Sequence, residues 1–302
     1  MTPVVTTIAE VRAAVVAARR RGNEIGFVPT MGALHEGHAA LVRAARAAGG
    51  FVVVSVFVNP TQFGPSEDFA KYPRTLDADR TLCHDAGADL VFAPAAAEMY
   101  PSRSVTFVEV AELDRELCGP RRPGHFRGVC TVVLKLFNVV LPDRAYFGAK
   151  DYQQARVVTQ MVRDLNVPVA VVVEPTVREA DGLAMSSRNR YLSTAERGAA
   201  PGIYRALLAV RDRAAVERDV AVLEAGLRAQ LAAIPGSRVD YAQVVDAETL
   251  QPIPRFERPV VAAVAVFLGT TRLIDNVVIE PPSEPGASLP GFLSRAAPVS
   301  GG

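Results

Sequence analysis

Residues 27–38 read FVPTMGALHEGH, and the interpretation of the whole chain begins with them. An apolar strand pattern passes through a glycine-bearing turn into an amphipathic helix pattern, which predicts a strand-turn-helix unit. Two of the four histidines of the chain, His35 and His38, lie at this junction. The first backbone N–H groups of a helix are unpaired and attract anions. These residues therefore predict a site for phosphate at this turn.

Two other interpretations of the histidine pair stay open. A helical zinc site of the metalloprotease type needs histidines at positions i and i+4. His35 and His38 are instead at i and i+3, with Gly37 between them. Histidines with a purely structural role in the turn are the other alternative. A histidine pair at a strand-to-helix junction favours phosphate binding over both.

The composition indicates a soluble globular protein. The chain has 302 residues, 49% of them hydrophobic and 22% charged, with a net charge of +1. This near-neutrality argues against a nucleic-acid partner, which requires a strongly basic face. No apolar run approaches the roughly 20 residues that span a bilayer, and the pattern of a signal peptide is absent, so we expect a cytoplasmic protein without a membrane partner. The three cysteines lack metal-ligand spacing, which predicts reduced thiols.

Alternating strand and helix patterns predict an α/β protein with a parallel sheet over residues 1–175. Helix patterns lie between the predicted strands and alternate with them along the chain. From about residue 176 the composition shifts to long helices and then three strands, which predicts a smaller α+β domain over 176–280. Residues 281–302 are rich in Pro, Gly, Ser and Ala, which is typical of a disordered tail. The predicted strands are 25–28, 51–58, 90–93, 106–110, a strand ahead of Gly148, 167–174, 239–245, 260–268 and 272–278.

Four further segments carry candidate site residues. Asn59 and Gln62 follow the second strand, and ligands of open α/β sheets bind beyond the carboxyl ends of strands. Residues 119–128 form a basic loop rich in Gly and Pro that we expect to close over an anion. Lys150 is one of only three lysines among 33 basic residues, and it lies where a helix is predicted to begin, although anions are the stabilising choice there. Residues 185–190 add two hydroxyls and two guanidinium groups, which are good donors to phosphate.

Taken in order, these motifs closely resemble the pantothenate synthetase family over roughly residues 4–280. The matching stretches are PTMGALHEGH at 29–38, VNPTQF at 58–63, RPGHFRGV at 122–129, FGAKDYQQ at 147–154 and DGLAMSSRN at 181–189. The resemblance implies a Rossmann-like domain followed by a smaller closing domain, in a cytoplasmic homodimer. It also implies an ATP- and magnesium-dependent condensation of pantoate with β-alanine through a pantoyl adenylate, with release of pyrophosphate and AMP.

The resemblance also implies roles for individual residues. His38, His35, Lys150 and Arg188 would stabilise charge on the phosphates during the reaction. Pantoate would be bound by Gln62, Gln154 and Arg122, and β-alanine by Gln62, with Asn59 and His125 as supporting residues. The implied ATP site consists of Met31, Gly32, Ala33, Leu34, His35, Glu36, Gly37, His38, Gly148, Ala149, Lys150, Asp151, Val177, Met185, Ser186, Ser187 and Arg188.

Magnesium is expected to travel mainly on the ATP phosphates, and the sequence identifies no protein ligand for it, although Asp77 and Asp79 are nearby acids. The family commonly has Glu where Ala149 stands, which puts any contact through that side chain in doubt. Two other functions are compatible with the histidine and lysine motifs. One is a nucleotidyltransferase that stops after attaching the nucleotide, and the other is a nucleotide-sensing protein that binds ATP without turnover.

Overall fold

The computed structural model describes residues 1–64, 68–102 and 104–281. Apart from Pro281, the tail predicted over residues 281–302 lies outside this range. Within the described residues, six parallel strands form one sheet in the order β1-β4-β3-β2-β5-β6. This confirms the predicted parallel α/β architecture. The strands are β1 Val4–Val5, β2 Ile25–Thr30, β3 Phe51–Val56, β4 Leu90–Phe92, β5 Arg144–Gly148 and β6 Ala170–Glu174.

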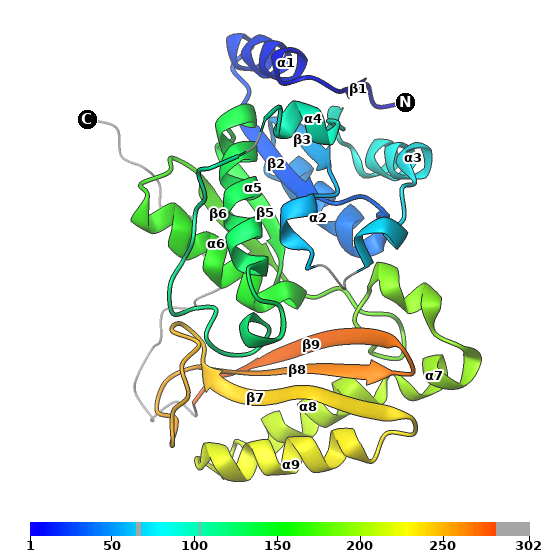
Figure 1. The fold of residues 1–302 in the computed structure, drawn as a ribbon, viewed down its shortest axis with the longest axis vertical. Coiled ribbons are helices and arrows are strands. Elements are labelled where there is room, and N and C mark those ends of the chain that lie inside the picture. Colours follow the sequence, from blue (N-terminus) through cyan, green and yellow to red (C-terminus); the bar gives the residue numbers. More distant parts are fainter. Residues whose placement is uncertain (65–67, 103, 282–302) are drawn as a thin grey trace.

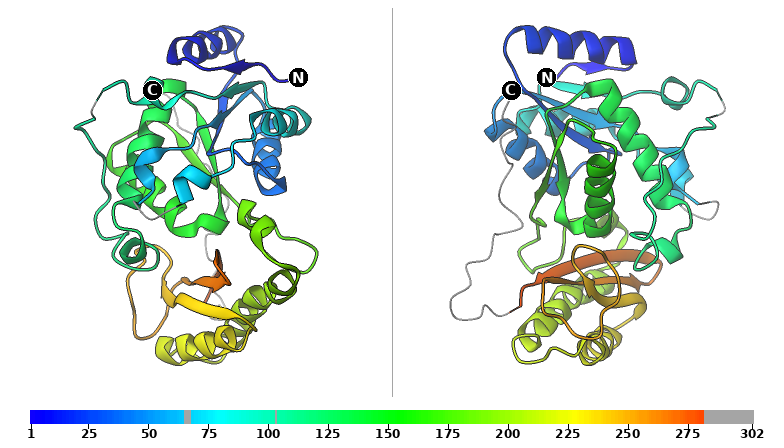
Figure 2. Two further views of the ribbon diagram at one scale, coloured as in Figure 1. Left: turned by 45° about the vertical axis from the view of Figure 1, so that its right-hand side comes forward. Right: turned by 90° about the vertical axis from the view of Figure 1, so that its left-hand side faces the viewer.

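Helices cover both faces of this sheet (Figures 1 and 2). On one face α1, α5 and α6 pack with the sheet in a core that includes Phe27 and Phe137, both almost fully buried. On the other face α2 and α3 bury a second core around Val28 and Val54. Neighbouring side chains of one strand thus enter opposite cores, as the period of two requires. These helices are α1 Ile8–Arg20, α2 Glu36–Ala47, α3 Leu76–Ala86, α5 His125–Val140 and α6 Tyr152–Asp164.

A separate antiparallel sheet of three strands, in the order β7-β8-β9, follows near the C-terminal end. It lies between the parallel-sheet domain and the helices α8 and α9, on the side away from α1 (Figure 1). Ile274 and Val278 of β9 pack toward the parallel-sheet domain, whereas Leu273 and Val277 pack toward α8 and α9. The additional elements are α4 Ala96–Met99, α7 Thr194–Ala199, α8 Gly202–Arg213, α9 Val220–Ala232, β7 Ser237–Asp246, β8 Val260–Leu268 and β9 Thr271–Ile279.

Local signals in the sequence located several of these elements correctly. The sequence patterns Thr7-x-x-Glu10 and Ser193-x-x-Glu196 predict capping boxes at helix starts. Both boxes are present, at the starts of α1 and α7. The second domain has the predicted helices and strands. The exact boundary predicted between residues 175 and 176 stays a prediction, although β6 ends beside it at Glu174.

Two predictions about the segment before α5 are wrong. Residues 106–110 form no strand: the Val108 N–H donates to the Thr131 hydroxyl of α5, at 3.0 Å, and the segment pairs with no strand among the described residues. The core spacing of Leu134, Phe137 and Val140 predicts a helix over residues 129–140, but α5 begins earlier, at His125. Gly124 adopts φ 79° as its N-cap, so the loop rich in Gly and Pro ends there. The short strand β1 was not predicted.

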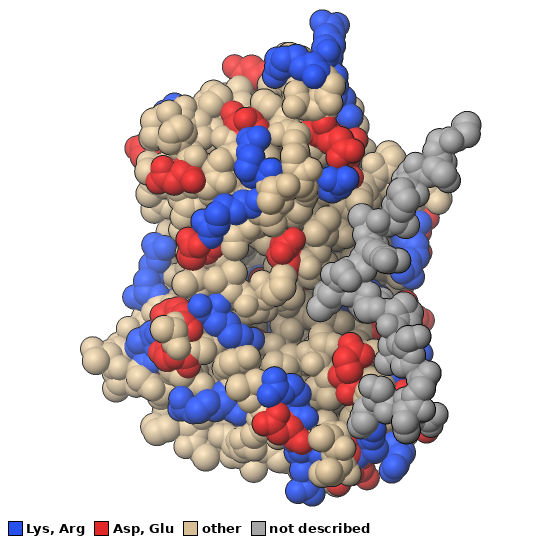
Figure 3. Space-filling model, turned by 180° about the vertical axis from the view of Figure 1, so that it is seen from behind, with Lys and Arg blue, Asp and Glu red and all other residues tan. Residues whose placement is uncertain are grey.

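The charged side chains show no segregation by sign on the face turned away from the view of Figure 1. Lys and Arg are interspersed there with Asp and Glu (Figure 3). Several charges of the protein form pairs, such as Arg46 with Asp89 and Arg197 with Glu179. No helix among residues 1–64, 68–102 and 104–281 is both long and apolar enough to span a bilayer.

Candidate active site

The predicted site segments follow three adjacent strands. The strands β3, β2 and β5 are neighbours and parallel, so their carboxyl ends lie at one edge of the sheet. The chain passes from β2 into residues 31–38, from β3 toward Asn59, and from β5 into the turn that contains Lys150. The order of the strands reverses between β2 and β5, and such a reversal is where open α/β sheets bind ligands.

The two histidines cap α2. His35 is the N-cap, and its Nδ1 accepts the N–H of Gly37 at 3.1 Å. The Nδ1 of His38 accepts the N–H of His35 at 3.3 Å, and the two ring centroids are 4.2 Å apart. Both Nδ1 atoms are therefore acceptors, which leaves the proton of each neutral ring on Nε2. The first N–H groups of this helix were expected to be unpaired, but the histidines accept two of them, those of His35 and Gly37.

Both histidines are neutral at physiological pH. Burial lowers the pKa of His35 to about 4, with the charge of Lys150 acting in the same direction. Burial lowers the pKa of His38 to about 3, and the neighbouring His35 and Lys150 contribute to the decrease. Each ring therefore offers an Nε2–H donor without a positive charge. The charge of Lys150 is therefore near enough to act on both rings.

Asp79 holds the turn that precedes the histidines. Its side chain is buried, and its carboxylate accepts the N–H of Ala33 at 3.1 Å and of Leu34 at 2.8 Å. Gly32 and Ala33 adopt positive φ angles of 83° and 51°, which opens both amides toward the carboxylate. No sequence pattern assigned this role to Asp79, since the partner amides lie more than 40 residues away.

Gly37 makes room for the imidazole of His35. A Cβ at this position would lie 2.9 Å from Cε1 and 3.0 Å from Nδ1 of that ring. The same position is 3.8 Å from the Cβ of Met185. This short distance places the segment before Ser186 against the histidine turn, although the two are about 150 residues apart in the sequence.

Lys150 lies in a short 3₁₀ turn, Ala149–Asp151, between β5 and α6. It was predicted at the start of a helix, and α6 itself begins two residues later at Tyr152. The ammonium group is 3.9 Å from Asp151, and its side chain is 20% exposed. The carboxamide of Asn276, from β9, donates to the backbone carbonyls of both Ala149 and Lys150. The second sheet therefore contacts the lysine turn directly.

The Ser-Ser-Arg segment follows an irregular hairpin. The N–H of Met185 donates to the carbonyl of Val177 at 3.0 Å, and Arg178 forms a bridge with Ala184. The hydroxyl of Ser186 accepts the N–H of Arg188 at 3.2 Å. Val177 and Met185 are thus neighbours across this hairpin, which explains how residues eight apart belong to one predicted site.

Gln62 and Asn59 form a buried polar turn after β3. The Nδ2 of Asn59 donates to Oε1 of Gln62 at 3.1 Å, and Nε2 of Gln62 is 3.1 Å from the sulfur of Met31. The backbone carbonyl of Gln62 is hydrogen-bonded to Nδ1 of His125, at 2.8 Å, and to Arg122, at 3.3 Å. Three of the five segments predicted to bind pantoate or ATP therefore meet at Gln62.

The two glutamines of α6 have different surroundings. Gln153 is buried and bonded to backbone groups of Leu113, Glu116 and Cys118. Both glutamines line the cavity described next, and Gln154 lacks the three backbone contacts of Gln153. Gln153 holds the preceding loop through these contacts, and the role predicted for Gln154 stays a prediction.

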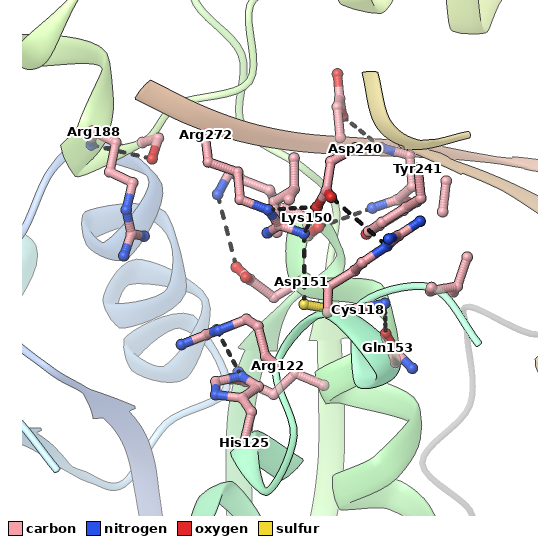
Figure 4. A pocket seen from close by; sticks show the side chains of 18 of the residues that line it. Cys118, Arg122, His125, Lys150, Asp151, Gln153, Arg188, Asp240, Tyr241 and Arg272 are labelled. Carbon is pink, nitrogen blue, oxygen red and sulfur yellow. Dashed lines mark hydrogen bonds and ion pairs between the residues drawn. The ribbon is translucent and has the colours of Figure 1, made fainter. Parts of the chain in front are cut away.

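A cavity of about 690 Å³ lies between the parallel-sheet domain and β7–β9 (Figure 4). Of the predicted site residues it is lined by Arg122, His125, Lys150, Asp151, Gln154, Ser186 and Arg188. Arg272, Asp240 and Asn276 of the small sheet also line it, and the sequence did not point to them. The described residues that line it do not include the histidine pair, Glu36 or Gln62; Glu36 is exposed and paired with Arg43.

Within the described residues, no three His, Cys, Asp or Glu side chains cluster as a metal site would require. Asp79 has both carboxylate oxygens engaged by backbone N–H groups, and Asp77 is exposed at the start of α3. These two acids therefore do not form a cage of protein oxygens.

Two histidines with Nε2–H donors, a lysine turn and a Ser-Ser-Arg segment near the switch point of a parallel sheet are typical of nucleotide-binding α/β enzymes. The model of the family "Pantoate-beta-alanine ligase" matches residues 3–278. The chain therefore belongs to the pantoate-beta-alanine ligase family and is a ligase.

The relatives agree in sequence and in structure. The pantothenate synthetase of Moorella thermoacetica is 57% identical over 275 residues, covering 91% of this chain and 97% of the relative. A crystal structure of pantothenate synthetase from Thermus thermophilus has a TM-score of 0.87 at 51% identity, covering 93% of this chain and all of that one. A pantoate-beta-alanine ligase from Francisella tularensis, complexed with beta-gamma ATP and beta-alanine, has a TM-score of 0.75 at 32% identity, covering 92% of this chain and 98% of that one.

Proposed function

We propose that this protein condenses pantoate with β-alanine to form pantothenate, using ATP and passing through pantoyl adenylate. The observation that carries the proposal is the meeting of the histidine pair, the Lys150 turn and the segment before Ser186 at one switch point. Family membership and the ATP and β-alanine complex of the Francisella ligase support it.

The first step joins pantoate to the α-phosphate of ATP. A carboxylate oxygen of pantoate attacks the α-phosphorus, the bond to the β-phosphate breaks, and pyrophosphate leaves with the electron pair. Negative charge then accumulates on the leaving pyrophosphate. The Nε2–H groups of His35 and His38 and the ammonium of Lys150 would stabilise it, because preorganised donors lower such barriers. Since both rings are neutral in the free protein, they act as hydrogen-bond donors.

The other segments would orient the reactants. The hydroxyls of Ser186 and Ser187 and the guanidinium of Arg188 would bind phosphate oxygens, as charge-assisted hydrogen bonds do. Gln62, Gln154 and Arg122 would bind pantoate, whose hydroxyls and carboxylate suit amides and a guanidinium. The remaining residues assigned to the ATP site belong to the same turns. Magnesium, held on the phosphates, would neutralise part of their charge.

The second step transfers the acyl group. The amine of β-alanine attacks the acyl carbon, the bond from that carbon to the phosphate oxygen breaks, and AMP leaves. The amine loses a proton as the amide forms. Gln62 would contact β-alanine here. Catalysis in both steps rests on positioning and electrostatics, with no covalent enzyme intermediate. We further propose that the protein acts as a homodimer in the cytoplasm.

The adenylate can be tested without the second substrate. With ATP, magnesium and pantoate but no β-alanine, we expect the enzyme to exchange labelled pyrophosphate into ATP, because formation of the adenylate is reversible. His38→Ala and Lys150→Ala should lower this exchange by orders of magnitude while the protein stays folded. Absence of exchange in the wild-type protein, or exchange that is independent of pantoate, would refute the adenylate.

A further inference from the structure

Asn276 connects the small sheet to the lysine turn. It is 7% exposed, and its Nδ2 donates at 3.0 Å to the carbonyl of Ala149 and at 2.9 Å to that of Lys150. Its neighbours Ile274 and Val278 on the same side of β9 pack against the core of the parallel-sheet domain. Asn276 therefore projects from the face of the small sheet that meets the Lys150 turn.

These two bonds fix the conformation of one residue. The carbonyl of Ala149 belongs to the peptide plane before the Cα of Lys150, and the carbonyl of Lys150 to the plane after it. Holding both planes restricts φ and ψ of Lys150, since these are the only soft backbone dihedrals between them. The direction of the Cα–Cβ bond follows from φ and ψ. A single carboxamide thus sets the direction in which the lysine side chain leaves the backbone.

The preceding residue immobilises Asn276. Asp275 is 4% exposed and accepts the N–H of Asn276 at 2.8 Å. Its carboxylate receives both terminal nitrogens of Arg178, at 2.7 and 3.0 Å, in a bidentate pair. Arg178 in turn donates to the carbonyl of Gly182 and stacks at 3.5 Å over Tyr204. The strand that carries Asn276 is therefore also bound to the hairpin that precedes Ser186.

We propose that Asn276 is a positioning residue for the phosphate-binding lysine, and that it links the seating of the small sheet to the alignment of Lys150. The inference rests on the proposed function, because it takes Lys150 to bind ATP phosphates. Other contacts between the two domains, such as that of Gln243 in β7 with the backbone N–H of Leu117 ahead of α5, do not reach this turn. Loss of Asn276 should consequently affect the ATP-dependent step, and loss of Gln243 should not.

The experiment compares Asn276→Ala, Asn276→Asp and the matched control Gln243→Ala. Asn276→Asp preserves the shape of the side chain but puts oxygen atoms against two carbonyls. We expect both variants of Asn276 to lower kcat for pantothenate formation by about tenfold to a hundredfold, which is the loss in rate that a small displacement of a catalytic group causes. The KM for pantoate should stay close to wild type, and each variant should remain folded at the assay temperature. An equal loss in Gln243→Ala would contradict the proposal, because it would show a general effect of domain docking.

A double-mutant cycle separates this inference from the proposed function. The ATP dissociation constant is measured for wild type, Asn276→Ala, Lys150→Ala and the double variant. If Asn276 acts through Lys150, its substitution weakens binding in the wild-type background but changes it by less than about twofold when Lys150 is absent. Equal effects in both backgrounds overturn the inference and leave the proposed function intact. Wild-type ATP binding and turnover in Lys150→Ala would instead overturn the assignment of the lysine.

Discussion

Replacing Asp79 by Asn should loosen the turn that leads into the histidine pair. The carboxylate accepts two backbone N–H groups, from Ala33 and Leu34, and a carboxamide can accept only one of them while its NH₂ faces the other. A hydrogen bond to a charged group contributes about 1.5–3 kcal/mol, so the free energy of unfolding should fall by that amount. At about 2–4 °C per kcal/mol the melting temperature should decrease by about 3–12 °C. Turnover should fall as well, because His35 and His38 follow this turn directly.

The assay measures the melting temperature and the magnesium dependence of turnover in parallel. Asp77→Asn is the control, since Asp77 lies in the same first turn of α3, and its substitution removes the same charge from an exposed position. We expect the control to leave the melting temperature nearly unchanged. We also expect Asp79→Asn to require the same magnesium concentration as wild type. A variant of Asp79 that melts like wild type but needs far more magnesium would show that Asp79 is a metal ligand and does not hold the turn.

Three other predictions concern the residues around the histidines and the glutamines of α6. Gly37→Ala should lower turnover by about tenfold or more, because its Cβ would displace the ring of His35; wild-type kcat in this variant would contradict the steric argument. Gln154→Ala should mainly raise the KM for pantoate, whereas Gln153→Ala should mainly lower the melting temperature through three lost backbone contacts; the reverse pattern would exchange their roles. Since the folded chain keeps His35 and His38 neutral down to a pKa of about 4 and about 3, the unfolded chain binds more protons below pH 6.5. The free energy of unfolding should therefore fall between pH 6.5 and 4, by no more than about 1.4 kcal/mol per pH unit for each histidine. In His38→Gln the free energy of unfolding, measured with urea at each pH, should fall less steeply over this range.

The strand and helix patterns predicted most of the fold because its elements follow local rules. Buried parallel strands read as continuous apolar runs, as in residues 51–56, and capping boxes mark the helices that begin after Thr7 and Ser193. The failure at residues 106–110 has a tertiary cause, since the partner of the Val108 amide is a side chain on α5. The pattern of the five residues 106–110 cannot show that the Val108 N–H is bonded to a side chain on a distant helix.

The sequence predicted the site segments that carry local motifs. It did not predict the residues from distant parts of the chain that hold these segments in place. The histidine pair and the Lys150 turn carry local signals, namely a glycine at a strand-to-helix junction and a lysine in a chain that prefers arginine. Asp79 and Asn276 act on these turns across 45 and 126 residues. Neither an acidic residue within a helix nor an amide residue within a strand belongs to a sequence motif whose spacing would identify such a role. Only the folded structure brings them to the turns that they hold.

Release of products by the purified protein is the decisive measurement for an AMP-forming condensation. The protein is supplied with ATP, magnesium and pantoate, and AMP and pyrophosphate are followed with and without β-alanine. We predict continuous release of AMP, pyrophosphate and pantothenate in equal amounts only when β-alanine is present. Pyrophosphate release at the same steady rate without β-alanine would indicate a nucleotidyltransferase. ATP binding with no pyrophosphate under either condition would indicate a nucleotide-binding protein, and both results would contradict the proposed function.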